Sequence, residues 1–168
     1  MTHIIHTAWE LNFNWGLERF EKVHIAGTRN LINLSCASTL PASPRVVFIS
    51  SIGVVSRYDP ETPVPEEPLP DPTLIGPGGY GEAKYVCERV LDEAARKSDV
   101  PVTVIRSGQI AGSSVDGYWA PTEYMPTMFK SSKILGKVPD KLPVRGFSLV
   151  YFFCHKLTDH VGHALVAC

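Results

Sequence analysis

Three short apolar segments, separated by two stretches with helical periodicity, constrain the fold of this chain most strongly. They span residues 3–6, 45–50 and 102–106, are rich in Val and Ile, and are typical of buried strands. The connections between them are long enough to hold helices, which implies parallel strands joined by right-handed crossovers. The sequence therefore predicts an α/β fold with a doubly wound parallel sheet.

Two helices are expected between these strands. In the first connection apolar residues recur every three or four positions, which predicts one buried stripe along a helix. That stripe consists of Leu17, Phe20, His24, Gly27, Leu31 and Leu34, with Gly27 permitting close approach to the sheet. The second helix, from about Tyr80 to Lys97, is expected to expose Asp92. Its buried face is predicted to hold Ala83, Cys87, Val90, Leu91 and Ala94.

The bulk composition narrows the function classes. A chain of 168 residues with 44% apolar residues is large enough for one packed domain. A net charge of -1 gives no basic footprint for nucleic acid, and no apolar run approaches the roughly 18 residues of a membrane span. The four cysteines form no CxxC pair, and a metal site at His155, His160 and His163 would require supporting carboxylates and a closed geometry, so no metal site is predicted. We expect a cytoplasmic protein with reduced thiols.

The candidate catalytic group consists of Ser51, Tyr80 and Lys84. Tyr80 opens the second helix and Lys84 follows one turn later on the same face. An ammonium beside a phenol favours the phenolate, so Lys84 is expected to lower the pKa of Tyr80 from about 10 toward a range useful for acid and base catalysis. Ser51 ends a strand, and open parallel sheets bind ligands at the carboxyl ends of their strands.

A proline-rich segment, residues 59–77, separates Ser51 from Tyr80. Its seven prolines exclude a helix or an interior strand, which leaves an ordered or a mobile surface loop. Residues 76–81 match G-x-G-x-x-G, the glycine pattern of dinucleotide-binding turns. That pattern requires a preceding strand, which is missing here, so residues 76–81 are interpreted as a flexible loop that lets Tyr80 approach substrate.

Five stretches carry a resemblance to a known family: HTAWELNFN, GTRNLINL, VVFISSIGVVS, YGEAKYVCERVL and VIRSGQIAG. They resemble the thioester reductase domains of fungal adenylate-forming reductases and nonribosomal-peptide-synthetase-like enzymes, from about Ile4 to Asp140. The resemblance implies an extended short-chain dehydrogenase, a Rossmann-like NAD(P)-binding domain of the male-sterility type. Such domains use NADPH to release an acyl thioester as an aldehyde or, further, an alcohol. The implied partner is the phosphopantetheine carrier domain that bears the acyl group.

The resemblance also implies roles for individual residues. Ser51 would polarise the thioester carbonyl, Tyr80 would donate a proton, and Lys84 would order the cofactor ribose and tune Tyr80. Further cofactor contacts are implied for His6, Thr7, Ala8, Gly108, Gln109 and Ile110. His24 stands where many extended dehydrogenases carry asparagine, and a histidine on an apolar helix face is more often structural than catalytic.

In the resembled family a glycine-rich strand–helix unit precedes the first strand found here. Residues 1–145 are therefore expected to be the C-terminal part of the reductase domain, and residues 146–168 a divergent tail. The isolated chain is expected to bind NADPH weakly and to leave one helix layer of its sheet uncovered. Two alternatives stay open: an extended dehydrogenase or epimerase acting on a free small-molecule carbonyl, and a catalytically silent truncated remnant.

Overall fold

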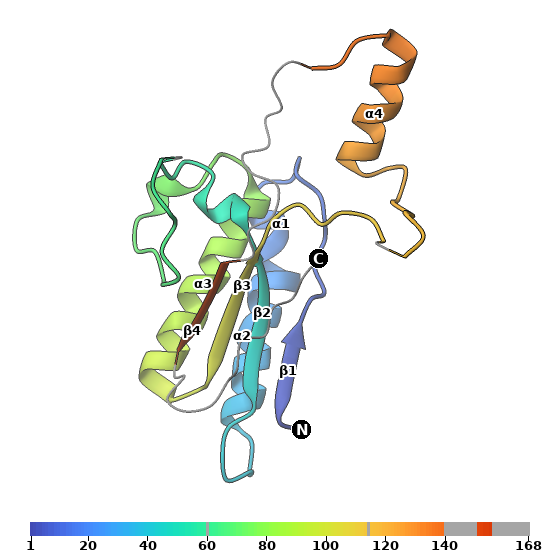
Figure 1. Ribbon diagram of the computed structural model, residues 1–168. Helices are drawn as coiled ribbons and strands as arrows, with labels where there is room; N and C mark the ends of the chain where they lie inside the picture. Colours follow the sequence, from blue (N-terminus) through green and yellow to red (C-terminus); the bar gives the residue numbers. More distant parts are fainter. Residues whose placement is uncertain (60, 114, 140–150, 156–168) are drawn as a thin grey trace. The chain divides into compact units, whose positions relative to one another are not determined.

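The computed structural model describes residues 1–59, 61–113, 115–139 and 151–155 (Figure 1). The described chain falls into two compact units. The first contains residues 1–107 and 151–155, and the second contains residues 108–139. The first unit is built on one sheet, whose strands are β1 (His3–His6), β2 (Arg45–Ser51), β3 (Val102–Ser107) and β4 (Tyr151–His155).

The strand order of the sheet is β1-β2-β3-β4. β1 pairs with β2 and β2 with β3 in parallel, whereas β4 runs antiparallel to β3. The three predicted parallel strands are thus confirmed, with ends within one residue of the expected ones. β4 lies in the stretch expected to be a divergent tail, most of which falls outside the described residues. Because Ser51 is paired with Ser107, β2 and β3 end level at one edge of the sheet.

Both long helical segments of the first unit pack on one face of the sheet (Figure 1). The first runs through α1 (Glu18–Phe20), the π-helical turn η1 (Glu21–Ile25) and α2 (Ala26–Cys36), and the second is α3 (Gly79–Ser98). The core between helices and sheet contains Ile4, Ile32, Val46, Phe48, Cys87, Leu91, Ala95, Val100, Val102 and Val104. Within α3, Asp92 is buried rather than exposed as predicted, because Arg89 and Arg96 donate hydrogen bonds to its carboxylate.

Beyond Phe20, the buried residues of the first helix each lie one position later in the sequence than the predicted apolar stripe. The buried residues are Phe20, Thr28, Ile32 and Ser35, while Leu34 is 50% exposed. η1 is the cause, since a π-helical turn takes up one residue more than an α-helical turn and rotates everything that follows. Gly27 is rotated away as well, and a Cβ added there would meet open space, so its expected role in close packing is wrong.

The opposite face of the sheet is less covered. Burial alternates along β2 and β3, and Ile5 of β1, whose side chain points to the outer face, is 67% exposed. That a helix layer is missing from this face stays a prediction.

The proline-rich segment is anchored rather than mobile. It follows the short helix η2 (Ile52–Val55) and contains a second one, η3 (Pro72–Leu74). Leu69 is buried against Val54 and Val55. The Gly76 N–H donates to Ser56 Oγ at 2.6 Å, and the Tyr85 hydroxyl of α3 donates to the Pro70 carbonyl at 2.9 Å. Of the two alternatives left by the sequence, the structure has the ordered loop.

The second unit contains the helix α4 (Tyr124–Leu135), which ends at Gly136 in the left-handed conformation with φ of 63°. Met125 is its buried residue, whereas Phe129, Ile134 and Leu135 are exposed. None of the helices in the described ranges is both long enough and apolar enough to cross a lipid bilayer.

Candidate active site

Glycines allow the backbone to bring the end of β2 and the start of α3 together. A Cβ on Gly81 would lie 3.3 Å from the Gly53 carbonyl oxygen, and one on Gly79 would lie 2.3 Å from the Gly16 carbonyl carbon. Gly78 has a φ of 127°, which side chains rarely adopt. The glycine-rich stretch is therefore a close-packed junction, and the expectation of a flexible loop was wrong.

Ser51 stands at this junction. It ends β2 in an extended conformation, and its Oγ accepts a hydrogen bond from the Gly53 N–H at 3.1 Å, which caps η2. Its side chain also lies close enough to Tyr80, the second residue of α3, to act on the pKa of the phenol. The structure thus brings Ser51 near Tyr80.

Tyr80 is half-buried between aromatic rings. Its ring centroid lies 4.8 Å from that of Phe13 and 6.3 Å from that of Phe20. Burial raises the pKa of Tyr80, and the side chain of Ser51 acts in the opposite direction. The expectation that Lys84 lowers the pKa of Tyr80 is wrong for this arrangement, because the Lys84 ammonium is directed elsewhere.

Lys84 is only 3% exposed and is enclosed by aromatic side chains. Its Nζ donates to the Ile49 carbonyl of β2 at 2.6 Å. The same atom lies 3.7 Å from the ring centroid of Trp9, 4.8 Å from that of Phe48 and 5.8 Å from that of Tyr80. Burial lowers the pKa of Lys84 to about 7, while Cys87 and Glu88 act to raise it. Lys84 can therefore gain or lose a proton near neutral pH.

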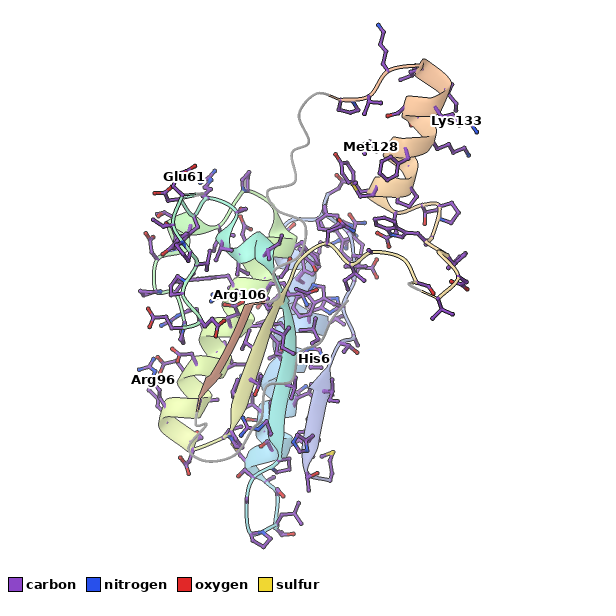
Figure 2. All side chains as sticks on the ribbon, viewed as in Figure 1. His6, Glu61, Arg96, Arg106, Met128 and Lys133 are labelled. Carbon is purple, nitrogen blue, oxygen red and sulfur yellow. The ribbon has the colours of Figure 1, made fainter. Side chains whose placement is uncertain are left out.

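His6 ends β1 beside this group and appears labelled in Figure 2. Thr28 donates its hydroxyl hydrogen to the His24 carbonyl at 2.9 Å, so the hydrogen bond of 3.1 Å between His6 Nε2 and Thr28 Oγ1 is assigned with His6 as donor. Burial, followed by the charges of Lys84 and His24, lowers the pKa of His6. His6 is therefore neutral at physiological pH.

His24 packs among rings, with its centroid 4.6 Å from that of Trp9 and 5.6 Å from that of Phe20. Burial and the charge of Lys84 lower its pKa, and Glu10 acts to raise it. These contacts support the structural interpretation of His24.

The other residues expected to contact a cofactor are exposed or belong to the second unit. Thr7 and Ala8 follow β1 and are exposed. Gly108, Gln109 and Ile110 follow β3 directly in the chain, and Gln109 Nε2 donates to the Ile110 carbonyl at 3.2 Å. They lie in the second unit, so the structure brings together Ser51, Tyr80, Lys84 and His6 and leaves this turn as a prediction.

The indole of Trp9, which packs on Lys84, indicates whether a polar ligand would suit the surroundings of Lys84. Its indole Nε1 is buried and has no hydrogen-bond partner among the residues described. A buried donor without an acceptor costs free energy, on the order of 1–3 kcal/mol. Its ring also covers Lys84, whose ammonium has three donor hydrogens. The chemistry of these two donors suits hydroxyl oxygens such as those of a ribose, and Lys84 and Tyr80 are the residues that would hold one.

No cluster of three or more metal-ligating side chains is found within the described ranges. His160 and His163, two of the C-terminal histidines, lie outside those ranges. The absence of a metal site therefore stays a prediction.

Three residues of the site were missed by the sequence reasoning: Trp9, Glu88 and Arg106. Arg106 carried a signal, because a charged residue inside an otherwise apolar strand must be paired when buried. Glu88 carried one too, since it lies four residues after Lys84 and shares the buried side of the helix. Trp9 carried no such signal, because its contact with Lys84 depends on the path of the chain after β1.

The comparisons with known proteins agree with this geometry. Residues 1–151 match the model of the male sterility protein family, an NAD-binding family. A carboxylic acid reductase of Neurospora crassa is 45% identical over 83% of this chain, and an adenylate-forming reductase of Heterobasidion annosum is 41% identical over 83%. A non-reducing polyketide synthase of Aspergillus niger is 42% identical over 83%. The chain spans 13%, 13% and 6% of these three proteins.

A solved structure gives the same assignment. The terminal R domain from the myxalamid PKS-NRPS biosynthetic pathway is 28% identical, with a TM-score of 0.69 over 80% of this chain and 33% of that one. Fold, site and relatives thus identify the chain as a member of the male sterility protein family of NAD-binding domains, with the Rossmann-like fold of extended short-chain dehydrogenases.

Proposed function

We propose that the protein containing this chain uses NADPH to reduce a carrier-bound acyl thioester to an aldehyde or, further, to an alcohol. The observation that carries this proposal is the meeting of Ser51, Tyr80 and Lys84 where β2 ends and α3 begins. Relatives named as carboxylic acid and adenylate-forming reductases support the substrate class. The preference for NADPH and the phosphopantetheine carrier domain as partner are part of the proposal.

The raised pKa of Tyr80 suits the role of a proton donor. A phenol whose pKa lies above its usual 10 stays protonated at neutral pH, so it can give its proton to an oxygen that gains negative charge. Ser51, which lies near Tyr80, would donate to the same oxygen and hold the carbonyl in place.

Lys84 would hold the cofactor rather than react. One of its hydrogens is used by the Ile49 carbonyl, which leaves two for ribose hydroxyls. NADPH, when bound, would supply a hydride to the carbonyl carbon, and Tyr80 would give a proton to the oxygen. As the carbon–sulfur bond breaks, the new hydroxyl group would give up its proton and the leaving thiolate would gain one, so the products would be the aldehyde and the free thiol.

The first test is Tyr80→Phe in the complete reductase that contains this chain, assayed with an acyl-loaded carrier and NADPH. Loss of a general acid lowers kcat by about a hundredfold or more. Tyr118→Phe is the matched control, because it removes the same hydroxyl from an exposed side chain. An activity of the Tyr80→Phe protein equal to that of the control would remove Tyr80 from the mechanism.

The second test concerns the substrate. The same enzyme is given the carrier thioester, the corresponding free aldehyde and a sugar nucleotide, each with NADPH or NADH. We expect the highest kcat/KM for the carrier thioester with NADPH. Faster turnover of the sugar nucleotide would instead assign the protein to the dehydrogenases and epimerases of free carbonyl compounds. No turnover and no nicotinamide binding would identify a silent remnant.

A further inference from the structure

A buried ion pair, formed by Glu88 and Arg106, lies next to the elements that carry Ser51 and Lys84. Arg106 of β3 is fully buried, and its Nη2 lies 2.8 Å from Glu88 Oε2. Its Nε donates to both carboxylate oxygens, at 3.1 and 3.2 Å. Glu88 itself is only 2% exposed. The planar guanidinium thus binds the carboxylate with two of its nitrogens, a geometry that lysine cannot reproduce.

The pair joins the elements that carry the catalytic residues. Ser50 of β2 donates its hydroxyl hydrogen to Glu88 Oε1 at 2.5 Å, and it is the register partner of Arg106. Ser50 immediately precedes Ser51, and Glu88 follows Lys84 by one turn of α3. A shift of the carboxylate would therefore be transmitted to both catalytic residues.

Arg106 also holds the proline-rich segment. Its Nη1 donates to the Pro65 carbonyl at 3.4 Å, and its Nη2 donates to the Glu67 carbonyl at 3.1 Å. Figure 2 shows Arg106 at the end of β3 that is nearer to this segment. The segment starts a few residues after Ser51 and ends shortly before Tyr80, so it connects the two elements that carry these catalytic groups.

We propose that Glu88 and Arg106 form a positioning pair, which holds β2, β3, α3 and the proline-rich segment in the one arrangement that brings Ser51, Tyr80 and Lys84 together. The catalytic part of this statement rests on the proposed function. Stability alone does not account for such a pair, since well-packed apolar side chains often serve equally well in its place. In contrast, only the planar guanidinium of an arginine, with its several donors in a fixed geometry, can bind one carboxylate and two loop carbonyls at once.

The Glu88 carboxylate has a second effect, on the charge of Lys84. The titratable groups around Lys84 are Cys87, Glu88 and Tyr80 on α3, His6 on β1 and His24 on η1. Of these, Cys87 and Glu88 act to raise the pKa of Lys84 against the effect of burial. Replacing the Glu88 carboxylate by an amide of the same shape should therefore favour the neutral amine of Lys84.

The contact of Arg106 with the proline-rich segment is tested on the full chain by Arg106→Lys, which keeps the positive charge but loses the planar guanidinium. Digestion with an endoprotease that cuts after glutamate reports on Glu61 and Glu66 in the proline-rich segment. We expect cleavage there to become at least about tenfold faster when the segment is released. Arg89→Lys is the matched control, because Arg89 contacts only helix neighbours in its described hydrogen bonds. Equal cleavage rates in the two variants would overturn the proposal.

The electrostatic link is tested by Glu88→Gln. In chain labelled with ¹³C at the lysine Cε, the Lys84 resonance is assigned by its loss in Lys84→Arg and followed from acid to alkaline pH. The midpoint should move below that of the unsubstituted chain, whereas Glu93→Gln, on the exposed side of α3, should leave it unchanged. An unchanged midpoint in Glu88→Gln contradicts the link. Should Glu88→Gln fail to fold, the double variant Glu88→Met/Arg106→Met replaces it in the same titration. It also removes the Glu88 charge, and Arg106 is not among the groups that shift the pKa of Lys84, so the midpoint should again fall; an unaltered midpoint contradicts the link.

Activity then separates this inference from the proposed function. In the complete reductase, Arg106→Lys should lower kcat at least about tenfold through misplacement of the catalytic groups, and it should raise KM for NADPH, because Lys84 would hold the cofactor. If the parent enzyme shows no thioester reduction, the proposed function fails while the proteolysis and the titration still decide the positioning pair. If the parent is active and Arg106→Lys has the same kcat, the positioning role is wrong.

Discussion

Lys84 and Arg106 are two buried cations on neighbouring elements of one domain, and the structure compensates their charges differently. Arg106 binds a carboxylate through two nitrogens and donates to two backbone carbonyls. Lys84 donates to the Ile49 carbonyl and otherwise faces aromatic rings. The nearest carboxylate that affects it, Glu88, is the one already engaged by Arg106.

This difference gives the two cations different roles: Arg106 stabilises the structure, whereas Lys84 can change its protonation state. A guanidinium matched by a carboxylate keeps its proton and fixes the elements around it. An ammonium with weak compensation loses much of its preference for the charged form, and the pKa of Lys84 falls to about 7. Lys84 is thus held in a state that costs stability, because burial penalises its charged form.

The largest expected effect comes from Arg106→Met, which leaves the Glu88 carboxylate buried without its partner. Breaking a buried pair from one side lowers the free energy of unfolding by about 3–5 kcal/mol. Urea unfolding followed by tryptophan fluorescence measures it. The double variant Glu88→Met/Arg106→Met should recover most of the loss, because no buried charge then remains. A loss below about 1 kcal/mol in the single variant would show that the charge is not matched as described.

The same substitution at the other cation should act in the opposite direction. Lys84→Met removes a group whose charged form is penalised by burial, so the free energy of unfolding at pH 7 should rise, on the order of 2 kcal/mol after loss of the hydrogen bond to Ile49. The penalty is complete below the folded pKa of about 7, shrinks as pH rises, and vanishes above the unfolded value of 10.5.

Urea titrations of both proteins between pH 6 and 10 test this. The advantage of Lys84→Met should be largest at the acidic end and decline steadily toward pH 10. A destabilised Lys84→Met protein at pH 7 would mean that the charge of Lys84 is compensated as well as that of Arg106, and the contrast between the two would disappear.

The smallest effect should come from the aromatic face over Lys84. Trp9→Leu removes a ring 3.7 Å from Nζ, and a cation–π contact of this kind contributes about 0.5–2 kcal/mol to the charged form. The pKa of Lys84 should therefore fall further, by about one unit, in the ¹³C titration. Trp15→Leu is the control, because that ring is paired with Arg19 instead. A midpoint that rises in Trp9→Leu would show instead that the ring acts on Lys84 chiefly by excluding water, and equal midpoints in the two variants would contradict the expected cation–π contribution.

The strands of this domain could be predicted from sequence because their signal is local. Runs of Val and Ile predicted β1, β2 and β3 with ends within one residue, and the spacing of Tyr80 and Lys84 predicted that they share a helix face. Their meeting with Ser51 followed from the rule that ligands bind at the carboxyl ends of parallel strands.

Features that depend on contacts distant in sequence could not be predicted in this way. The pairing of Glu88 with Arg106 requires the strand register and the rotation of α3, neither of which a single sequence displays. The raised pKa of Tyr80 and the lowered pKa of Lys84 arise from burial, whereas the sequence reasoning considered only the charge of one acting on the other. Asp92 was misassigned for a related reason, since acidic residues on a helix are usually exposed.

The π-helical turn η1 also bears on how chains of this type tolerate a change of length. With one residue removed between Glu21 and Ile25, a regular α-helix would bring Thr28, Ile32 and Ser35 onto the same side as Phe20, since each would then lie seven, eleven or fourteen positions away. A deletion here would leave the buried side chains of the helix facing the sheet, although deletions inside helices ordinarily rotate one end against the other. Aligned relatives should therefore show single-residue gaps within this turn, in the middle of a helix and not in a loop.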